Sequence, residues 1–119
     1  MLKRFYPNEY LDSAYQIDFD CLFQEGYRGI IFDVDNTLVP HGAPADDRAK
    51  KLFNHLKKLG YQCCLLSNNK EPRVKIFNDE VQVQYIFKAR KPKISGYERA
   101  MELMGTNKEN TLFVGDQIF

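Results

Sequence analysis

The sequence lacks a long hydrophobic run, an excess of charge and an even set of cysteines. Its longest aliphatic or cysteine run, Cys63-Cys64-Leu65-Leu66, is far shorter than the roughly 20 residues that cross a membrane. Seventeen Lys and Arg against sixteen Asp and Glu leave a net charge of +1, so no global field attracts nucleic acid or membrane. Three cysteines, two of them adjacent, argue against a disulfide framework. We therefore expect a cytoplasmic protein with no transmembrane segment and no nucleic-acid partner.

The composition is that of a globular domain. Hydrophobic residues make up 44% and charged residues 28% of the 119 positions, and no repeat or Gly/Ser-rich linker divides them. We expect a single domain over residues 1–119. Apolar runs without alternation predict buried strands, and apolar stripes at helical spacing predict helices. The strands are expected near residues 29–32, 61–66, 83–87 and 111–114, and the helices near residues 19–25, 46–59, 72–81 and from 95 onward.

This alternation of strands and helices predicts an α/β fold, a doubly wound parallel sheet. The helix ends carry matching signals. Asp18 is a candidate N-cap, Gly26 and Gly60 are candidate stops, and Ser95-x-x-Glu98 reads as a capping box.

Reactive side chains follow each predicted strand. Asp33 and Asp35 follow the first strand, Ser67 the second, Lys91 the third and Asp116 the fourth. Because open α/β sheets bind ligands at the carboxyl ends of their strands, we expect these groups to share one crevice.

The residue types suit phosphoryl transfer. Asp33 and Asp116 offer carboxylates to Mg²⁺, and an ionised Asp33 has the chemistry of a nucleophile toward phosphorus. Asp35 is a candidate general acid and base, and Lys91 would offset developing negative charge. Ser67 and the amides at the next helix start can hold phosphate oxygens.

The segment Asp-Val-Asp-Asn-Thr-Leu-Val, which begins at Asp33, resembles motif one of the haloacid dehalogenase (HAD) superfamily. Ser67, Lys91 and Gly115-Asp116 fall in order where motifs two, three and four belong. Three segments are similar to those of YqeG-like phosphatases of HAD subfamily IIIA: Leu-Ser-Asn-Asn, Lys-Ala-Arg-Lys-Pro and Val-Gly-Asp-Gln. The likeness spans most of the chain.

The resemblance implies a Rossmann-like HAD core, Mg²⁺, a nucleophile at Asp33 and an acid/base at Asp35, whose backbone carbonyl would also bind the metal. We assign phosphate binding to Ser67, Asn68 and Thr37. The substrate would be a phosphomonoester; some YqeG-like proteins are phosphatidylglycerophosphate phosphatases, which implies a phospholipid headgroup and peripheral membrane contact. The spacing between the motifs leaves no room for a cap domain.

The chain departs from the family pattern after motif four, where it stops at Gln117-Ile118-Phe119. The resemblance implies that the last strand and helix of the core are missing, which would leave strand 111–114 as a bare edge. We expect this edge to pair with a second copy in a homodimer or to aggregate. A catalytically impaired phosphate- or partner-binding remnant of the HAD fold is the alternative function.

Each residue also has a purely structural interpretation. Aspartates after strands act as turn formers or caps, Ser67 as a turn hydroxyl, and the basic residues around Lys91 as a solvated charge run. His55 is expected to be exposed and His41 to lie in a solvated loop. Cys63 and Cys64 read as small core residues. The N-terminal aromatics would pack onto the domain or, less simply, contact a membrane surface. They are Phe5, Tyr6, Tyr10, Tyr15 and Phe19.

Overall fold

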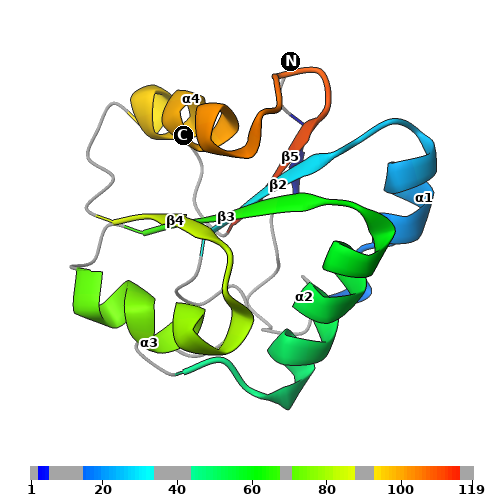
Figure 1. Cartoon of the computed structure of the whole chain (residues 1–119). Helices are drawn as coiled ribbons and strands as arrows, with labels where there is room; N and C mark the ends of the chain where they lie inside the picture. Colours follow the sequence, from blue (N-terminus) through cyan, green and yellow to red (C-terminus); the bar gives the residue numbers. More distant parts are fainter. Residues whose placement is uncertain (1–2, 6–14, 34–43, 68–70, 88–92, 116–119) are drawn as a thin grey trace.

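The structure is a computed structural model that describes residues 3–5, 15–33, 44–67, 71–87 and 93–115. Nine elements follow one another along the chain (Figure 1): β1 (Lys3–Phe5), α1 (Phe19–Gln24), β2 (Gly29–Asp33), α2 (Asp47–Leu59), β3 (Gln62–Leu66), α3 (Glu71–Val81), β4 (Gln84–Ile86), α4 (Lys93–Met104) and β5 (Thr111–Val114).

The five strands form one sheet in the order β1-β5-β2-β3-β4, and every pairing among the described strands is parallel. From β2 the chain runs outward through α2 to β3 and through α3 to β4. The connection through α4 then returns to β5, on the other side of β2. The strand order therefore reverses between β2 and β5, which is the topological switch point of a doubly wound sheet. The predicted Rossmann-like α/β fold is confirmed.

Each face of the sheet carries its own hydrophobic core. Side chains alternate along β2, so that Ile30 and Phe32 lie on one face and Ile31 on the other. The first face packs against α1, α2 and α3, and the second packs against α4 (Figure 1). Because β2 is covered on both faces, its sequence shows a continuous apolar run in place of alternation. Cys63 and Cys64 are buried on opposite faces, as predicted for core residues.

The helix ends follow the predicted signals with one exception. The Asp18 carboxylate caps α1 by accepting from the Cys21 amide, as predicted. Asp46, the first residue of the predicted helix 46–59, lies just before α2 and caps it by accepting from the Ala49 amide, a role that was not predicted. Gly60 ends α2 in a left-handed conformation. The capping box at Ser95 is wrong, because α4 begins at Lys93 and Ser95 already lies inside the helix. Pro92 precedes that start in the sequence, and proline suits the beginning of a helix better than its interior.

The edge of the sheet also differs from the prediction. Strand β5 is not a bare edge, because β1 pairs with it in parallel register: Lys3 opposite Leu112, Arg4 opposite Phe113 and Phe5 opposite Val114. The N-terminal chain thereby meets the backbone groups that were expected to bind a second copy. The predicted homodimer through this edge loses its structural basis. The edges of the described sheet are β1 and β4.

Candidate active site

The switch point brings Asp33 of β2 and Gly115 after β5 to neighbouring strand ends. Asp33 is the last residue of β2. Phe32 pairs with Val114, so the next residue on each strand is Asp33 on β2 and Gly115 after β5. Gly115 is buried and leads in the sequence directly to Asp116. The backbone thus starts the two segments that carry the predicted metal ligands at the same edge of the sheet.

Ser67 lies at the same edge, one strand further along. Asp33 pairs with Leu66, and Ser67 follows Leu66 at the end of β3. The Ser67 amide donates to the Ile86 carbonyl at 3.0 Å, which extends the ladder between β3 and β4 by one residue. Only 4% of Ser67 is exposed, so its position is fixed by the surrounding chain. A buried hydroxyl at the carboxyl edge, with a helix starting at Glu71, fits a phosphate-binding residue.

The start of α3 is tied to β4 by an aromatic residue. The Tyr85 hydroxyl donates to Glu71 Oε2 at 2.9 Å, and Glu71 is the first residue of α3. This hydrogen bond raises the pKa of Tyr85 above its ordinary value of 10.0. The contact holds the amino end of α3, with its partial positive charge, beside the end of β4. Neither residue stood out in the sequence, because the contact joins positions 71 and 85 across two different elements.

Five of the predicted site residues lie outside the described residues: Asp35, Thr37, Asn68, Lys91 and Asp116. Asp33 is described through its backbone at the end of β2. Among the described residues, no group of three or more His, Cys, Asp or Glu side chains is placed to hold a metal ion. The structure therefore assembles the backbone frame of the site at β2, β3 and β5, and the roles of the individual side chains stay predictions.

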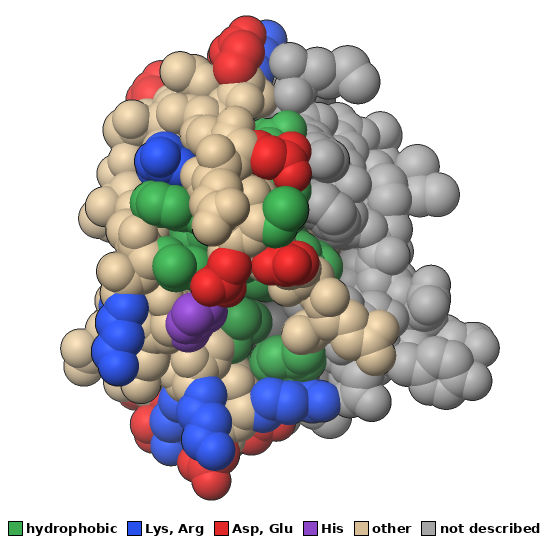
Figure 2. Space-filling view, turned by 90° about the vertical axis from the view of Figure 1, so that its right-hand side faces the viewer, with side chains coloured by type: hydrophobic (Ala, Val, Ile, Leu, Met, Phe, Trp, Pro, Cys, Tyr) green, Lys and Arg blue, Asp and Glu red, His purple; other side chains and the backbone are tan. Residues whose placement is uncertain are grey.

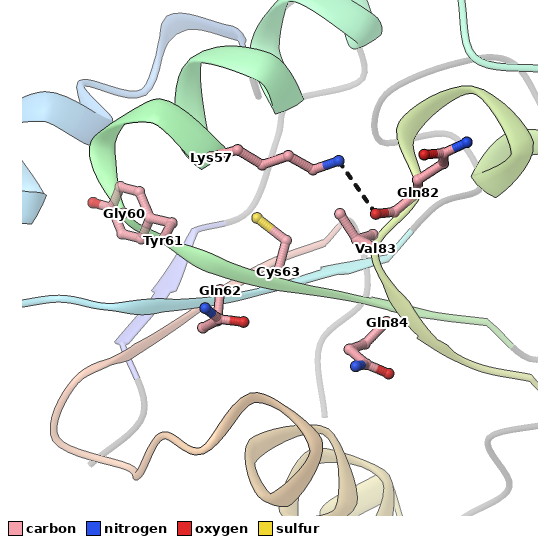
Figure 3. A pocket seen from close by; sticks show the side chains of 8 residues that line it. All are labelled: Lys57, Gly60, Tyr61, Gln62, Cys63, Gln82, Val83 and Gln84. Carbon is pink, nitrogen blue, oxygen red and sulfur yellow. Dashed lines mark hydrogen bonds between the residues drawn. The ribbon is translucent and has the colours of Figure 1, made fainter.

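A cavity of about 500 Å³ lies at the opposite end of the sheet (Figure 3). It is lined at the start of β3 by Gln62 and Cys63 and before and in β4 by Gln82 and Gln84. Across it, the Lys57 ammonium donates to the carbonyls of Val81 at 2.6 Å and Gln82 at 3.2 Å. Through these hydrogen bonds the lysine caps the last carbonyls of α3. The lining contains no carboxylate, so this cavity offers no metal ligands of the kind expected at Asp33.

The thiol of Cys63, which lines this cavity, is unreactive near neutral pH. Burial raises the pKa of Cys63 to about 12, so the group is a protonated thiol near neutral pH. Burial raises the pKa of Cys64 to about 12 as well. Both residues therefore serve packing, as their place in an apolar strand predicted.

The face formed by α1 and α2 carries charged side chains around apolar ones (Figure 2). His55 is exposed, as predicted, and its Nε2 lies 2.7 Å from Asp20 Oδ1 on α1. The predicted packing of the N-terminal aromatics is confirmed for Phe19, which is buried, and for Tyr15, which packs against the same core. The side chains of Phe5, Tyr6 and Tyr10 and the residue His41 lie outside the described part of the chain.

Within the described residues, no helix has the length and apolar character needed to cross a membrane.

Two comparisons bear on this site. Residues 39–119 match the family model described as haloacid dehalogenase-like hydrolase, and this stretch includes Ser67, Lys91 and Asp116. The chain is 38% identical over 120 residues to the probable phosphatase YqeG of Bacillus subtilis (strain 168). That match covers 99% of this chain and 70% of the relative.

Proposed function

The chain belongs to the haloacid dehalogenase-like hydrolase family, and from that premise we propose that it is a phosphatase that hydrolyses a phosphomonoester through an aspartyl-phosphate on Asp33. The observation that carries the proposal is the position of Asp33 at the carboxyl end of β2, beside the switch point and one strand from the buried Ser67. The similarity to a probable phosphatase supports the same reaction class.

In the first step, a carboxylate oxygen of Asp33 attacks the phosphorus atom of the substrate. The bond between phosphorus and the leaving-group oxygen breaks, and Asp35 donates a proton to that oxygen. Ser67, Asn68 and Thr37 hold the non-reacting phosphate oxygens, and Lys91 balances the negative charge that develops on them.

In the second step, Asp35 takes a proton from a water molecule that attacks the phosphorus of the aspartyl-phosphate. The bond between phosphorus and Asp33 breaks, which releases inorganic phosphate and restores the free carboxylate. Asp33 and Asp35 need opposite protonation states at the start, a difference that the environments of neighbouring carboxyl groups can impose.

The donor set fits a magnesium ion. Asp33 ends β2, and Gly115, which precedes Asp116 in the sequence, follows the neighbouring strand β5. Two carboxylates and the carbonyl of Asp35 are the hard oxygen ligands that Mg²⁺ prefers. When bound, Mg²⁺ would neutralise phosphate charge and offset the repulsion between the carboxylates.

A phospholipid headgroup is the substrate that we propose to test first. The resemblance to YqeG-like proteins points to phosphatidylglycerophosphate, and the connections after β2 and β3 are too short to contain a cap domain that would exclude a large substrate. Residues 34–46 alone join β2 to α2, and α3 occupies most of the connection between β3 and β4. We propose that the protein acts in the cytoplasm and reaches such a substrate at the membrane surface.

The test is release of inorganic phosphate from an aryl phosphate with and without Mg²⁺. We expect the Asp33→Asn variant to lose at least about a thousandfold in kcat, because the amide is a far weaker nucleophile. Asp79→Asn is the matched control, since Asp79 is exposed on α3 and the same charge is removed there. Chelation of Mg²⁺ should abolish turnover in the wild type and the control.

Equal rates for wild type and Asp33→Asn would refute the mechanism. A folded wild-type protein that binds phosphate with Mg²⁺ but releases none from any phosphomonoester would favour the binding remnant over the phosphatase.

A further inference from the structure

An exposed aromatic side chain stands at the carboxyl edge of the sheet. Phe87 directly follows β4 and is 39% exposed. Among the described residues, the other exposed large hydrophobic side chains are Ile76 and Leu103, which belong to the helices α3 and α4. Phe87 therefore is the member of this group that lies at a strand end, on the side of the sheet where Asp33 ends β2.

The backbone brings Phe87 close to the predicted phosphate-binding residue. The Ser67 amide donates to the Ile86 carbonyl at 3.0 Å, so Phe87 is the next residue after the partner of Ser67. The rings of Phe87 and Tyr85 lie 6.5 Å apart, and Tyr85 is fixed to the start of α3 by its bond to Glu71. The two rings thus lie one after the other between the first residue of α3 and the edge of the candidate site.

The core does not account for Phe87. Tyr85 packs against the hydrophobic core on the α1–α3 face, and Ile86 packs against the core on the α4 face. Phe87 belongs to neither core. Its exposed position would suit a polar residue better, because a polar side chain is more easily solvated. A partly exposed apolar ring beside the predicted phosphate-binding residue is suited to contact the part of a substrate that carries the phosphate.

We propose that Phe87, backed by Tyr85, is a specificity residue that packs against an apolar leaving group of the phosphomonoester. The inference rests on the proposed phosphatase function and names its substrate class: a phosphate ester whose alcohol presents an aryl or hydrocarbon group next to the phosphate. This class is an alternative to phosphatidylglycerophosphate, whose reacting phosphate is esterified to a polar glycerol unit, and the experiment below distinguishes the two. Because the connections after β2 and β3 are too short to contain a cap domain, this ring is an apolar surface of the described residues that can contact the leaving group.

The experiment compares kcat/KM for phenyl phosphate and for glycerol 3-phosphate, whose leaving group is polar. We expect Phe87→Ala to lower kcat/KM for phenyl phosphate about tenfold and to change that for glycerol 3-phosphate less than about twofold, since the lost contact is apolar. Phe87→Leu keeps an apolar surface and should recover most of the loss. Leu103→Ala is the matched control, because Leu103 is 42% exposed on α4, and it should affect neither substrate.

A binding measurement makes the test independent of turnover. We expect wild type to bind benzylphosphonate more tightly than methylphosphonate in the presence of Mg²⁺, and Phe87→Ala to remove that preference. Equal losses for both substrates, an unchanged preference, or equal binding of the two phosphonates by wild type would overturn the inference while leaving the role of Asp33 intact. Light scattering supplies a last check: a larger mass for wild type than for Phe87→Ala would assign the ring to a contact between copies and likewise overturn it.

Discussion

The end of α2 offers a quantitative test of how this chain is folded. Gly60 has φ of 112° and closes the helix, since its amide donates to the carbonyls of Leu56 and Lys57. A Cβ atom at Gly60 would lie 3.2 Å from the ring of Phe23, which contacts the Tyr61 ring edge to face. Gly60→Ala therefore meets two costs, one in the backbone and one in the packing between α1 and α2.

Gly26 isolates the first cost. Its φ is 111°, almost the same as that of Gly60, yet nothing lies within 4 Å of a Cβ atom built there. The left-handed backbone should cost about 1–2 kcal/mol in each alanine variant. Displacement of the Phe23 ring should add about 0.5–1.5 kcal/mol to Gly60→Ala alone, the usual cost of moving a side chain off its rotamer.

Thermal unfolding measures both terms. We expect Tm to fall by about 3–6 °C per kcal/mol in a domain of this size, so that Gly60→Ala unfolds several degrees below Gly26→Ala. In a Phe23→Leu background the difference between the two alanine variants should shrink, because the ring that Cβ approaches is gone. Equal losses at the two glycines in the wild-type background would refute the packing argument, and no loss at Gly26 would refute the backbone argument.

Two further predictions concern the thiols and the N-terminal strand. The stability should fall as the pH rises from about 9 to 12, because folding keeps the Cys63 and Cys64 thiols protonated with pKa about 12, whereas unfolded thiols ionise near 9.0. Between these pH values each thiol should lower the free energy of unfolding, measured with urea, by about 1.4 kcal/mol per pH unit. Cys63→Ala should flatten this dependence of the unfolding free energy on pH, and an unchanged dependence would contradict the linkage. Deletion of residues 1–5 should uncover the edge of β5 and produce concentration-dependent association in light scattering, since unpaired strand edges bind other chains. A deletion variant that stays monomeric and unfolds at the wild-type temperature would show that β1 contributes nothing to the sheet.

Much of the site was accessible from the sequence because parallel sheets follow simple rules. A continuous apolar run from Gly29 to Phe32 indicates a strand covered on both faces, and the residue after such a run lies at the ligand-binding edge. The structure agrees at Asp33 and Ser67, which end neighbouring strands. Their chemical roles depend on side-chain and metal geometry and stay predictions.

The wrong predictions have two physical causes: an element too short to give a signal, and a local signal that packing overrides. Strand β1 has three residues and therefore no measurable periodicity, so its pairing with β5 was missed. The Ser95 capping box has the expected residue types at the expected spacing, but α4 starts two residues earlier, at Lys93. Propensity at one helix end is worth about 1 kcal/mol, which the packing of α4 on the sheet can override.

The sequence by itself determined the properties that depend on neighbours along the chain: the buried strands, the Asp18 cap, the end of α2 at Gly60 and the burial of the adjacent cysteines Cys63 and Cys64. Only the tertiary structure decided which distant segments meet, such as His55 with Asp20, Tyr85 with Glu71 and Ile86 with Ser67. The physical reason is range. Caps and periodicity act over one or two turns of chain, whereas these contacts exist only after the strands have found their order in the sheet.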